Sequence, residues 1–253
     1  MSWRDILFCG DPHGVFTPAI QAALTRRPAA LVLLGDYQLD RPLHAVMAPV
    51  IEAGIRVLAI CGNHDSDRQE WWERYEDSGS VERIDGRIVS VDGPDGPVRI
   101  AGLGGTFGGN VWCPDQVTGG MNELKHGPHA ITTRLAARAG TKPAERYRSG
   151  LTLRHMTRIW PEDVHRLALQ SADILVTHEA PRPHRHGFQA LGELAEWMGV
   201  RVHIHGHHHE DYQEMGHAGA HVVGVGLAGV YSLAERRHMA PGLLGNRKQR
   251  EKR

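Results

Sequence analysis

Short runs of apolar residues recur along the chain, many of them β-branched, and each is followed by a turn that contains glycine. Runs of this length, bounded by turn residues, are typical of strands buried in a sheet. The pattern predicts strands at Ile6–Cys9, Leu31–Leu34, Ile55–Cys61, Val98–Ala101, Ile174–Val176, Val200–Ile204 and His221–Val225.

Several stretches between these runs have the 3.6-residue periodicity of amphipathic helices. They predict helices at Thr17–Arg26, Pro42–Ala53, Pro161–Gln170 and Phe188–Met198. In the last of these, Leu191, Leu194 and Trp197 fall on one face. Strands that alternate with helices indicate an α/β fold in which helices cover the faces of sheets.

We expect residues 1–245 to form a single domain, because no linker-like stretch or internal repeat divides them. The segment from about 102 to 158 interrupts the rhythm: it is rich in glycine and then polar and basic. Irregular segments of this length are usually functional or disordered, so it is either a lid or substrate loop, or a floppy insertion. Residues 246–253 predict a basic, flexible tail.

The composition narrows the functional classes. Hydrophobic residues make up 41% of the 253 positions, enough for a substantial core. Lys plus Arg and Asp plus Glu each number 29, and this zero formal net charge disfavours a nucleic acid as partner. No apolar stretch approaches a membrane span, no signal-peptide layout is present and the 3 cysteines lack CxxC spacing. We therefore expect a cytoplasmic protein without a membrane partner.

Histidine is the unusual residue, with 18 copies, and many lie beside Gly, Asp or Asn just after the predicted strands. Ligand sites of α/β sheets lie at this edge, and imidazole is the commonest metal ligand in proteins. The strand-end blocks are Gly10-Asp11-Pro12-His13-Gly14, Gly35-Asp36, Gly62-Asn63-His64-Asp65, Thr177-His178-Glu179 and Gly206-His207-His208-His209. Such mixed oxygen and nitrogen donors predict a divalent transition metal.

These five blocks, in this order and with these separations, resemble the calcineurin-like metallophosphoesterase superfamily. The resemblance covers roughly residues 6–209. It implies a four-layer αββα sandwich, with two mixed β-sheets flanked by helices and a dinuclear metal site at the strand ends. It also implies a phosphoester hydrolase with two divalent transition-metal ions, manganese first, with iron or zinc as alternatives.

The resemblance assigns each matching residue a role. Asp11, His13 and His209 would bind the first metal, Asn63, His178 and His207 the second, and Asp36 would bridge both. A hydroxide shared by the two metals would attack phosphorus, and His64 would protonate the leaving oxygen or stabilise its charge.

The Gly206 block has further expectations of its own. In an extended segment, His207 and His209 would face the metals and His208 would point away. His203 and His205 would either orient a ligand or simply pack within the strand.

Substrate contacts are less sharply defined by the sequence. Arg182 and Arg185 follow His178 closely and could bind a phosphate group. Protein phosphatases of the superfamily carry Asp and Arg three and four residues after the bridging Asp, where this chain has Leu39 and Asp40, followed by Arg41. This shift leaves the phosphate contacts of Asp40 and Arg41 open. Trp71 and Trp72 fit core packing or, alternatively, a wall of the substrate cleft.

The Gly-Asn-His-Asp block is similar to the diesterase branches, whereas Gly14 after His13 is also found in bacterial protein phosphatases. We therefore expect a phosphodiester or small nucleotide-type substrate. The alternatives are a phosphomonoesterase or Ser/Thr-type protein phosphatase, and a catalytically silent interaction scaffold. A nuclease would need a basic track, which the net charge does not support.

Overall fold

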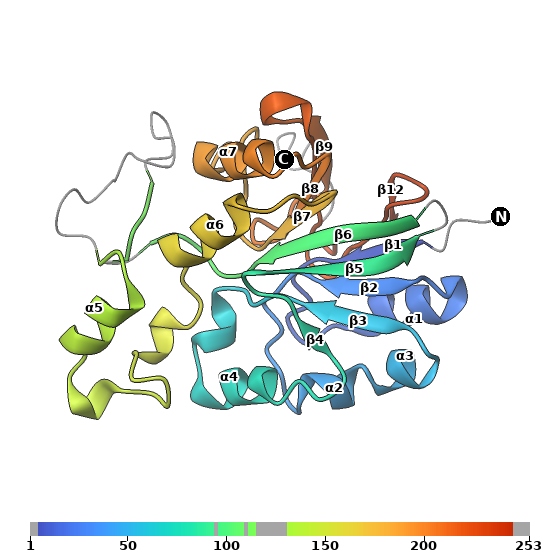
Figure 1. The fold of residues 1–253 in the computed structure, drawn as a ribbon. Coiled ribbons are helices and arrows are strands. Elements are labelled where there is room, and N and C mark those ends of the chain that lie inside the picture. The colour runs from blue at the N-terminus through green and yellow to red at the C-terminus, as the bar shows by residue number, and fades with distance from the viewer. Residues whose placement is uncertain (1–4, 94–95, 109–110, 115–130, 245–253) are drawn as a thin grey trace.

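The structure, a computed structural model, describes residues 5–93, 96–108, 111–114 and 131–244. Within them, two six-stranded mixed sheets face each other (Figure 1). The first sheet runs in the order β12 (Arg237–Ala240), β11 (Val230–Ser232), β1 (Ile6–Cys9), β2 (Ala30–Leu33), β3 (Arg56–Ala59) and β4 (Glu82–Arg83). The second runs β5 (Arg87–Gly93), β6 (Gly96–Leu103), β7 (Ile174–Thr177), β8 (Val202–His205), β10 (His221–Gly224) and β9 (Tyr212–Met215).

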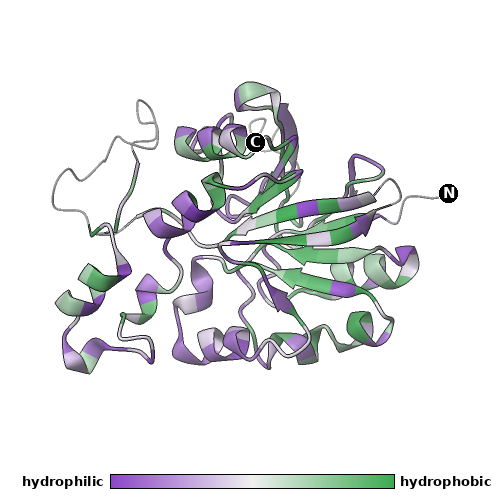
Figure 2. Cartoon of the chain, viewed as in Figure 1, coloured by the Kyte–Doolittle hydropathy of each residue, from purple (hydrophilic) through white to green (hydrophobic). Residues whose placement is uncertain are grey.

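The alternation of side chains along each strand produces the layers. Along β1, Ile6 and Phe8 belong to a core between the two sheets, whereas Leu7 and Cys9 face the helices. On the first sheet these helices are α1 (Thr17–Arg26), α2 (Leu43–Val46), α3 (Ala48–Glu52) and α4 (Gln69–Glu76). On the second they are α6 (Pro161–Ala168) and α7 (Gln189–Trp197). The expected αββα sandwich is confirmed, and both sheets are largely hydrophobic in Figure 2.

Parallel pairing of the strands determines where the loops that carry the predicted ligands lie. Strands β1 to β4 are parallel neighbours, and so are β6, β7, β8 and β10. The carboxyl ends of parallel strands meet at one edge, so the loops after β1, β2, β3, β7 and β8 can converge there.

Two helix predictions need correction. The single helix expected over Pro42–Ala53 is two short ones, α2 and α3, because Pro49 has no backbone N–H to continue the helical ladder. The apolar face expected on α7 holds for Leu191 and Leu194, but Trp197 is 51% exposed. The edge strands β9 and β12 were not predicted, since their sequences, YQEM and RHMA, are largely polar.

The segment from 102 to 158 is more ordered than expected. It contains α5 (Arg134–Gly140) and the 3₁₀ turns η3 (Pro143–Glu145) and η4 (Leu153–His155), and a third such turn, η1 (His64–Ser66), follows β3. Trp112, Ala137 and Leu151 are buried in the helix-side core of the second sheet. The prediction of a floppy insertion is therefore wrong for these residues. Residues 115–130, which belong to this segment, and the tail 246–253 are outside the described residues.

Candidate metal centre

The loops after five strands bring the predicted ligands to one edge of the sandwich. Asp11 and His13 follow β1, Asp36 follows β2, and Asn63 follows β3. His178 directly follows β7, and the loop after β8 carries His207 and His209. The first three strands belong to one sheet and the last two to the other, so the site spans both sheets.

The backbone of these loops is held in unusual conformations. Five of the predicted ligands have positive φ: Asp11 (32°), His13 (41°), Asp36 (58°), His207 (69°) and His209 (55°). Residues with side chains rarely adopt this region, and such strain gathers at functional sites. Glycine permits the close packing around them, because a Cβ on Gly62 would lie 2.2 Å from Asp36 Oδ1 and one on Gly206 2.6 Å from Asp11 Oδ1.

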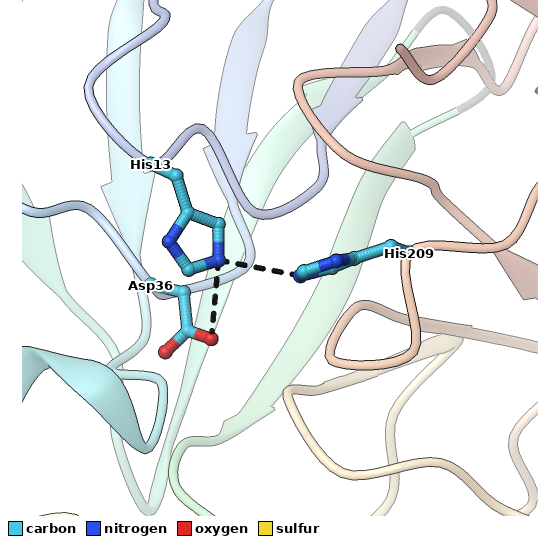
Figure 3. Close-up of side chains that lie close together, drawn as sticks. All are labelled: His13, Asp36 and His209. Atoms are coloured by element: carbon cyan, nitrogen blue, oxygen red, sulfur yellow. Dashed lines mark hydrogen bonds and ion pairs between the residues drawn. The ribbon is translucent and has the colours of Figure 1, made fainter. Parts of the chain in front are cut away.

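A first group of donors consists of His13, Asp36 and His209 (Figure 3). His13 Nε2 lies 3.6 Å from Asp36 Oδ2 and 3.2 Å from His209 Nε2. His209 Nε2 is also 3.8 Å from Asp11 Oδ2, which places the second carboxylate beside this group. Several ligand atoms directed at one point are the arrangement that a cation needs.

A second group consists of Asp36, His178 and His207. His178 Nε2 lies 3.4 Å from Asp36 Oδ2 and 3.0 Å from Asn63 Oδ1. The other ring nitrogen, Nδ1, is 2.7 Å from the carbonyl oxygen of Leu34, a contact that orients the imidazole. Asp36 thus belongs to both groups, as a bridging carboxylate must.

The donor atoms fit two cations. The buried oxygens Asp11 Oδ1, Asp11 Oδ2 and Asp36 Oδ2 accept no hydrogen bond from the part of the chain that the structure describes. Buried carboxylate oxygens without donors are costly unless they are compensated by a cation. Burial also lowers the pKa of His207 to about 3, so its neutral ring can offer a lone pair to a metal.

The charges of the remaining ligands are tightly linked. Burial, together with the Asp36 charge, raises the pKa of Asp11 to about 7. Burial alone would raise the pKa of Asp36, but attraction to His178 and the N–H of His64 hold it below its usual range. Burial would lower the pKa of His178, yet the two carboxylates raise it to about 10. A proton on His178 therefore supplies part of the positive charge that a metal would bring.

The histidine run after β8 is not extended, contrary to the expectation. β8 ends at His205, and the positive φ of His207 and His209 bends the chain. His208 still turns away from the two metal groups: its ring stacks on His184 at 4.1 Å and its Nε2 lies 3.8 Å from Glu179 Oε1. Bends in the loop, rather than the alternation of an extended strand, therefore direct His208 away from the side on which His207 and His209 lie.

Glu179 is a residue whose position the sequence did not predict. It is 3% exposed, and its Oε1 lies 3.9 Å from His207 Nε2 as well as near His208, so the three form a further group of potential donors. Its place directly after His178 was the available signal. A carboxylate beside a ligating imidazole commonly orients that ring.

His64 lies at the rim, with its ring 5.7 Å from that of His13. Its backbone N–H donates to Asp36 Oδ1 at 2.8 Å, and its Nδ1 lies 2.6 Å from Asp67 Oδ2. Burial would lower the pKa of His64, but the bond to Asp67 and the Asp36 charge raise it. Asp67, three residues along the chain, thus holds the ring, whereas Asp40 is exposed and forms no ion pair with it among the described residues.

Asp65 connects the loops that carry Asp36 and Asn63. Its two carboxylate oxygens accept the backbone N–H groups of Asp36 (3.1 Å), Tyr37 (2.7 Å) and Gly62 (2.7 Å). The side chain is 1% exposed. The loops after β2 and β3 are therefore fixed to one another through a single carboxylate.

The predicted substrate contacts are not part of either donor group. Arg185 pairs with the buried Glu210 at 3.1 Å, and Arg41 is exposed. Arg182 is partly buried, and its backbone N–H donates to the carbonyl of Phe188. His203 and His205 are buried and bonded to Thr177 and Tyr212, which favours the packing role over the orientation of ligands.

The two donor groups form a candidate dinuclear metal centre at one edge of the αββα sandwich, and the comparisons with known proteins give the family. Residues 4–211 match the family model described as calcineurin-like phosphoesterase. The chain belongs to this family of metal-dependent phosphoester hydrolases, which typically use a dinuclear metal site.

Relatives extend the comparison to most of the chain. An uncharacterized protein of Haemophilus influenzae is 35% identical over 208 residues, which cover 82% of this chain and 84% of that protein. The crystal structure of TT1561 of Thermus thermophilus has a TM-score of 0.57 at 14% identity and covers 95% of this chain and 99% of its own. The latter shows a shared fold. Among the described residues, no helix has the length and apolar character needed to cross a membrane.

Proposed function

We propose that this chain hydrolyses a phosphodiester in a small, nucleotide-type substrate. The observation that carries the proposal is Asp36, whose carboxylate belongs to both donor groups and has a buried oxygen without a hydrogen-bond donor in the described structure. The remaining ligands would be Asp11, His13 and His209 on one side and Asn63, His178 and His207 on the other. Two divalent ions, manganese first and iron or zinc as alternatives, supply Lewis-acid charge and an activated water when bound.

His64 would act on the leaving group. Its Nδ1 is engaged by Asp67, which leaves Nε2 as the atom that donates a proton to the leaving oxygen. Against the lowering effect of burial, Asp67 and the Asp36 charge raise the pKa of His64, which favours the acid form of the ring. Its backbone N–H on Asp36 ties the acid to the bridging carboxylate, so the acid and the metals keep a fixed relation.

The pairing of Arg185 favours a diester over a monoester as the substrate. A phosphodiester carries one negative charge, whereas a monoester near neutral pH carries close to two. Arg185, the exposed arginine after β7, is already paired with Glu210. A substrate with a single charge needs less additional cationic contact.

The experiment compares bis(4-nitrophenyl) phosphate with 4-nitrophenyl phosphate as substrates of Mn²⁺-loaded protein. We expect faster cleavage of the diester, with no turnover by Asp36→Asn and normal turnover by Asp92→Asn, a control at an exposed position of β5. A preference for the monoester would replace the diesterase with a phosphatase. The protein with both metals bound could also fail to cleave either substrate or a panel of cyclic and linear nucleotide diesters. That result would favour the alternative of a catalytically silent interaction scaffold.

A further inference from the structure

A second buried polar region lies behind the loop that carries Asn63. It is a cavity of about 160 Å³ between the ends of β3 and β6, helix α4 and the segment 151–158. Its walls include Cys61, Trp72, Arg83, His155 and Arg158. None of the lining residues is a candidate metal ligand, so the cavity is separate from the metal centre.

Three polar atoms of the cavity walls have no hydrogen-bond partner among the described residues. They are Nε1 of Trp72, Nε of Arg83 and Nδ1 of His155. The first two carry hydrogen and can only donate, and Trp72 is 2% exposed, so water outside the protein does not reach it freely. Buried donors are nearly always satisfied, which indicates an acceptor inside the cavity.

The carboxylates of the walls bond to other groups, and in the described structure none of them forms a hydrogen bond with these three nitrogens. Asp85 Oδ1 accepts the backbone N–H of Cys61 at 2.8 Å, and Oδ2 accepts the hydroxyl of Tyr75 at 2.6 Å. Oδ2 also lies 3.9 Å from Arg83 Nε, beyond hydrogen-bond distance. Asp163 is bound by the guanidinium groups of Arg134 and Arg166. An acceptor from outside the described residues would meet this need.

The charge of the walls is positive. Arg83, Arg134 and Arg158 line the cavity against Asp85 and Asp163. Arg158 donates to the hydroxyl of Thr106 at 3.1 Å, and within the described part of the chain it forms no ion pair. A partly buried guanidinium without a carboxylate is a binding element for an oxyanion.

We propose that this cavity binds a small oxyanion of the size of phosphate or sulfate, whose oxygens accept hydrogen bonds from Trp72, Arg83 and Arg158. Its volume is well below the roughly 300 Å³ at which pockets begin to hold drug-sized ligands, so a nucleoside does not fit. The site adjoins the metal loop, because the Thr157 hydroxyl bonds to that of Ser66 at 2.7 Å and to the carbonyl of Asn63 at 3.4 Å. The inference is independent of the substrate proposed above.

Crystals of the protein soaked in selenate test the proposal by location. The anomalous signal of selenium distinguishes an anion in the cavity from one at the metal centre. We expect selenate within hydrogen-bond distance of Trp72 Nε1 and Arg158. A cavity that holds only water under these conditions, with or without selenate at the metals, would overturn the proposal.

Calorimetric titration of metal-free protein with sulfate measures the same site in solution. Trp72→Phe removes the indole donor and Arg158→Gln removes the charge and the guanidinium donors, and each should weaken sulfate binding about tenfold or more. Arg148→Gln is the matched control, because Arg148 lies just before residues 151–158 but pairs with Glu73 at the surface. Equal affinity in all four proteins, or no binding to the wild type, would contradict the proposal; if Trp72→Phe does not fold, Arg158→Gln carries the comparison.

Discussion

Two polar regions share the segment 61–67: the metal centre lacks hydrogen-bond donors, and the cavity lacks acceptors, among the described residues. At the metal centre, oxygens of Asp11 and Asp36 lack donors within the described structure. In the cavity behind it, nitrogens of Trp72 and Arg83 lack acceptors from the same set of residues. Both regions are held by the same short stretch of chain, since Asn63 belongs to one and Cys61 to the other.

The difference shows how a folded chain indicates the charge of its ligands. A buried polar atom is stable only when its hydrogen-bonding or charge requirement is met. Buried carboxylate oxygens without hydrogen-bond donors indicate a cation as the ligand, and buried N–H groups without acceptors beside a guanidinium group indicate an anion. The comparison predicts that substitutions on one side leave the binding properties of the other side intact, unless they loosen the shared segment.

The largest effect in this comparison is expected for His64→Gln. This change removes the proton donor, so turnover of a diester with an alkoxide leaving group should fall roughly 10²- to 10³-fold. A nitrophenolate leaving group needs little protonation, so turnover of a nitrophenyl diester by His64→Gln should fall much less. Metal content and sulfate affinity should equal those of the wild type; equal losses for both leaving groups would remove His64 from the role of acid.

Asp67→Asn should reduce turnover about tenfold by releasing the His64 ring. The pH profile gives the diagnostic readout. Burial lowers the pKa of His64 and Asp67 raises it, so loss of the carboxylate lowers this pKa. Because the protonated ring is active, the fall in kcat at high pH should begin at a lower pH in the variant. An unchanged pH profile would show that Asp67 does not hold the acid.

Asp65→Asn should weaken both regions, because Asp65 fixes the shared segment. The amide retains one oxygen where the carboxylate supplied acceptors to three N–H groups. At least one buried N–H then lacks a partner, and the free energy of unfolding should fall by about 1–3 kcal/mol. Urea unfolding of metal-free protein measures this fall, with Asp92→Asn as the exposed control. A fall confined to the metal-loaded protein would contradict the structural role.

The two regions should also differ in proton release. In metal-free protein, the two carboxylates raise the pKa of His178 to about 10 against the lowering effect of burial, so the ring is protonated at neutral pH. A metal displaces this proton and any proton on Asp11, so metal affinity should rise with pH while at least one proton leaves per chain. Calorimetry of Mn²⁺ binding in buffers of different ionisation enthalpy measures the release. Sulfate binding in the cavity should release no proton near neutral pH. A metal titration without proton release would contradict the protonated state of His178.

The sequence predicted the layers and the blocks at the strand ends because both depend on local patterns. Apolar periodicity identifies strands such as β1, and a donor just after a strand lies at the ligand edge. The roles of Asp65, Asp67 and Glu179 were not predictable in this way, because they depend on where a side chain points in space.

The cavity has still less of a local signature. Its walls come from positions as far apart as Cys61 and Asp163, and the residues themselves are ordinary core or surface types. Only the folded chain shows that the Trp72 indole, predicted as either core or cleft wall, is both buried and short of an acceptor among the described residues.

The central claim is that Asp36 is shared by two cations. The most direct test is the count of Mn²⁺ ions per chain, by elemental analysis after equilibrium dialysis, in wild-type protein and in Asp36→Asn. The account predicts two ions in the wild type and fewer than one in the variant, because both groups lose their common charge. A single ion in the wild type, or two ions retained by Asp36→Asn, would contradict it.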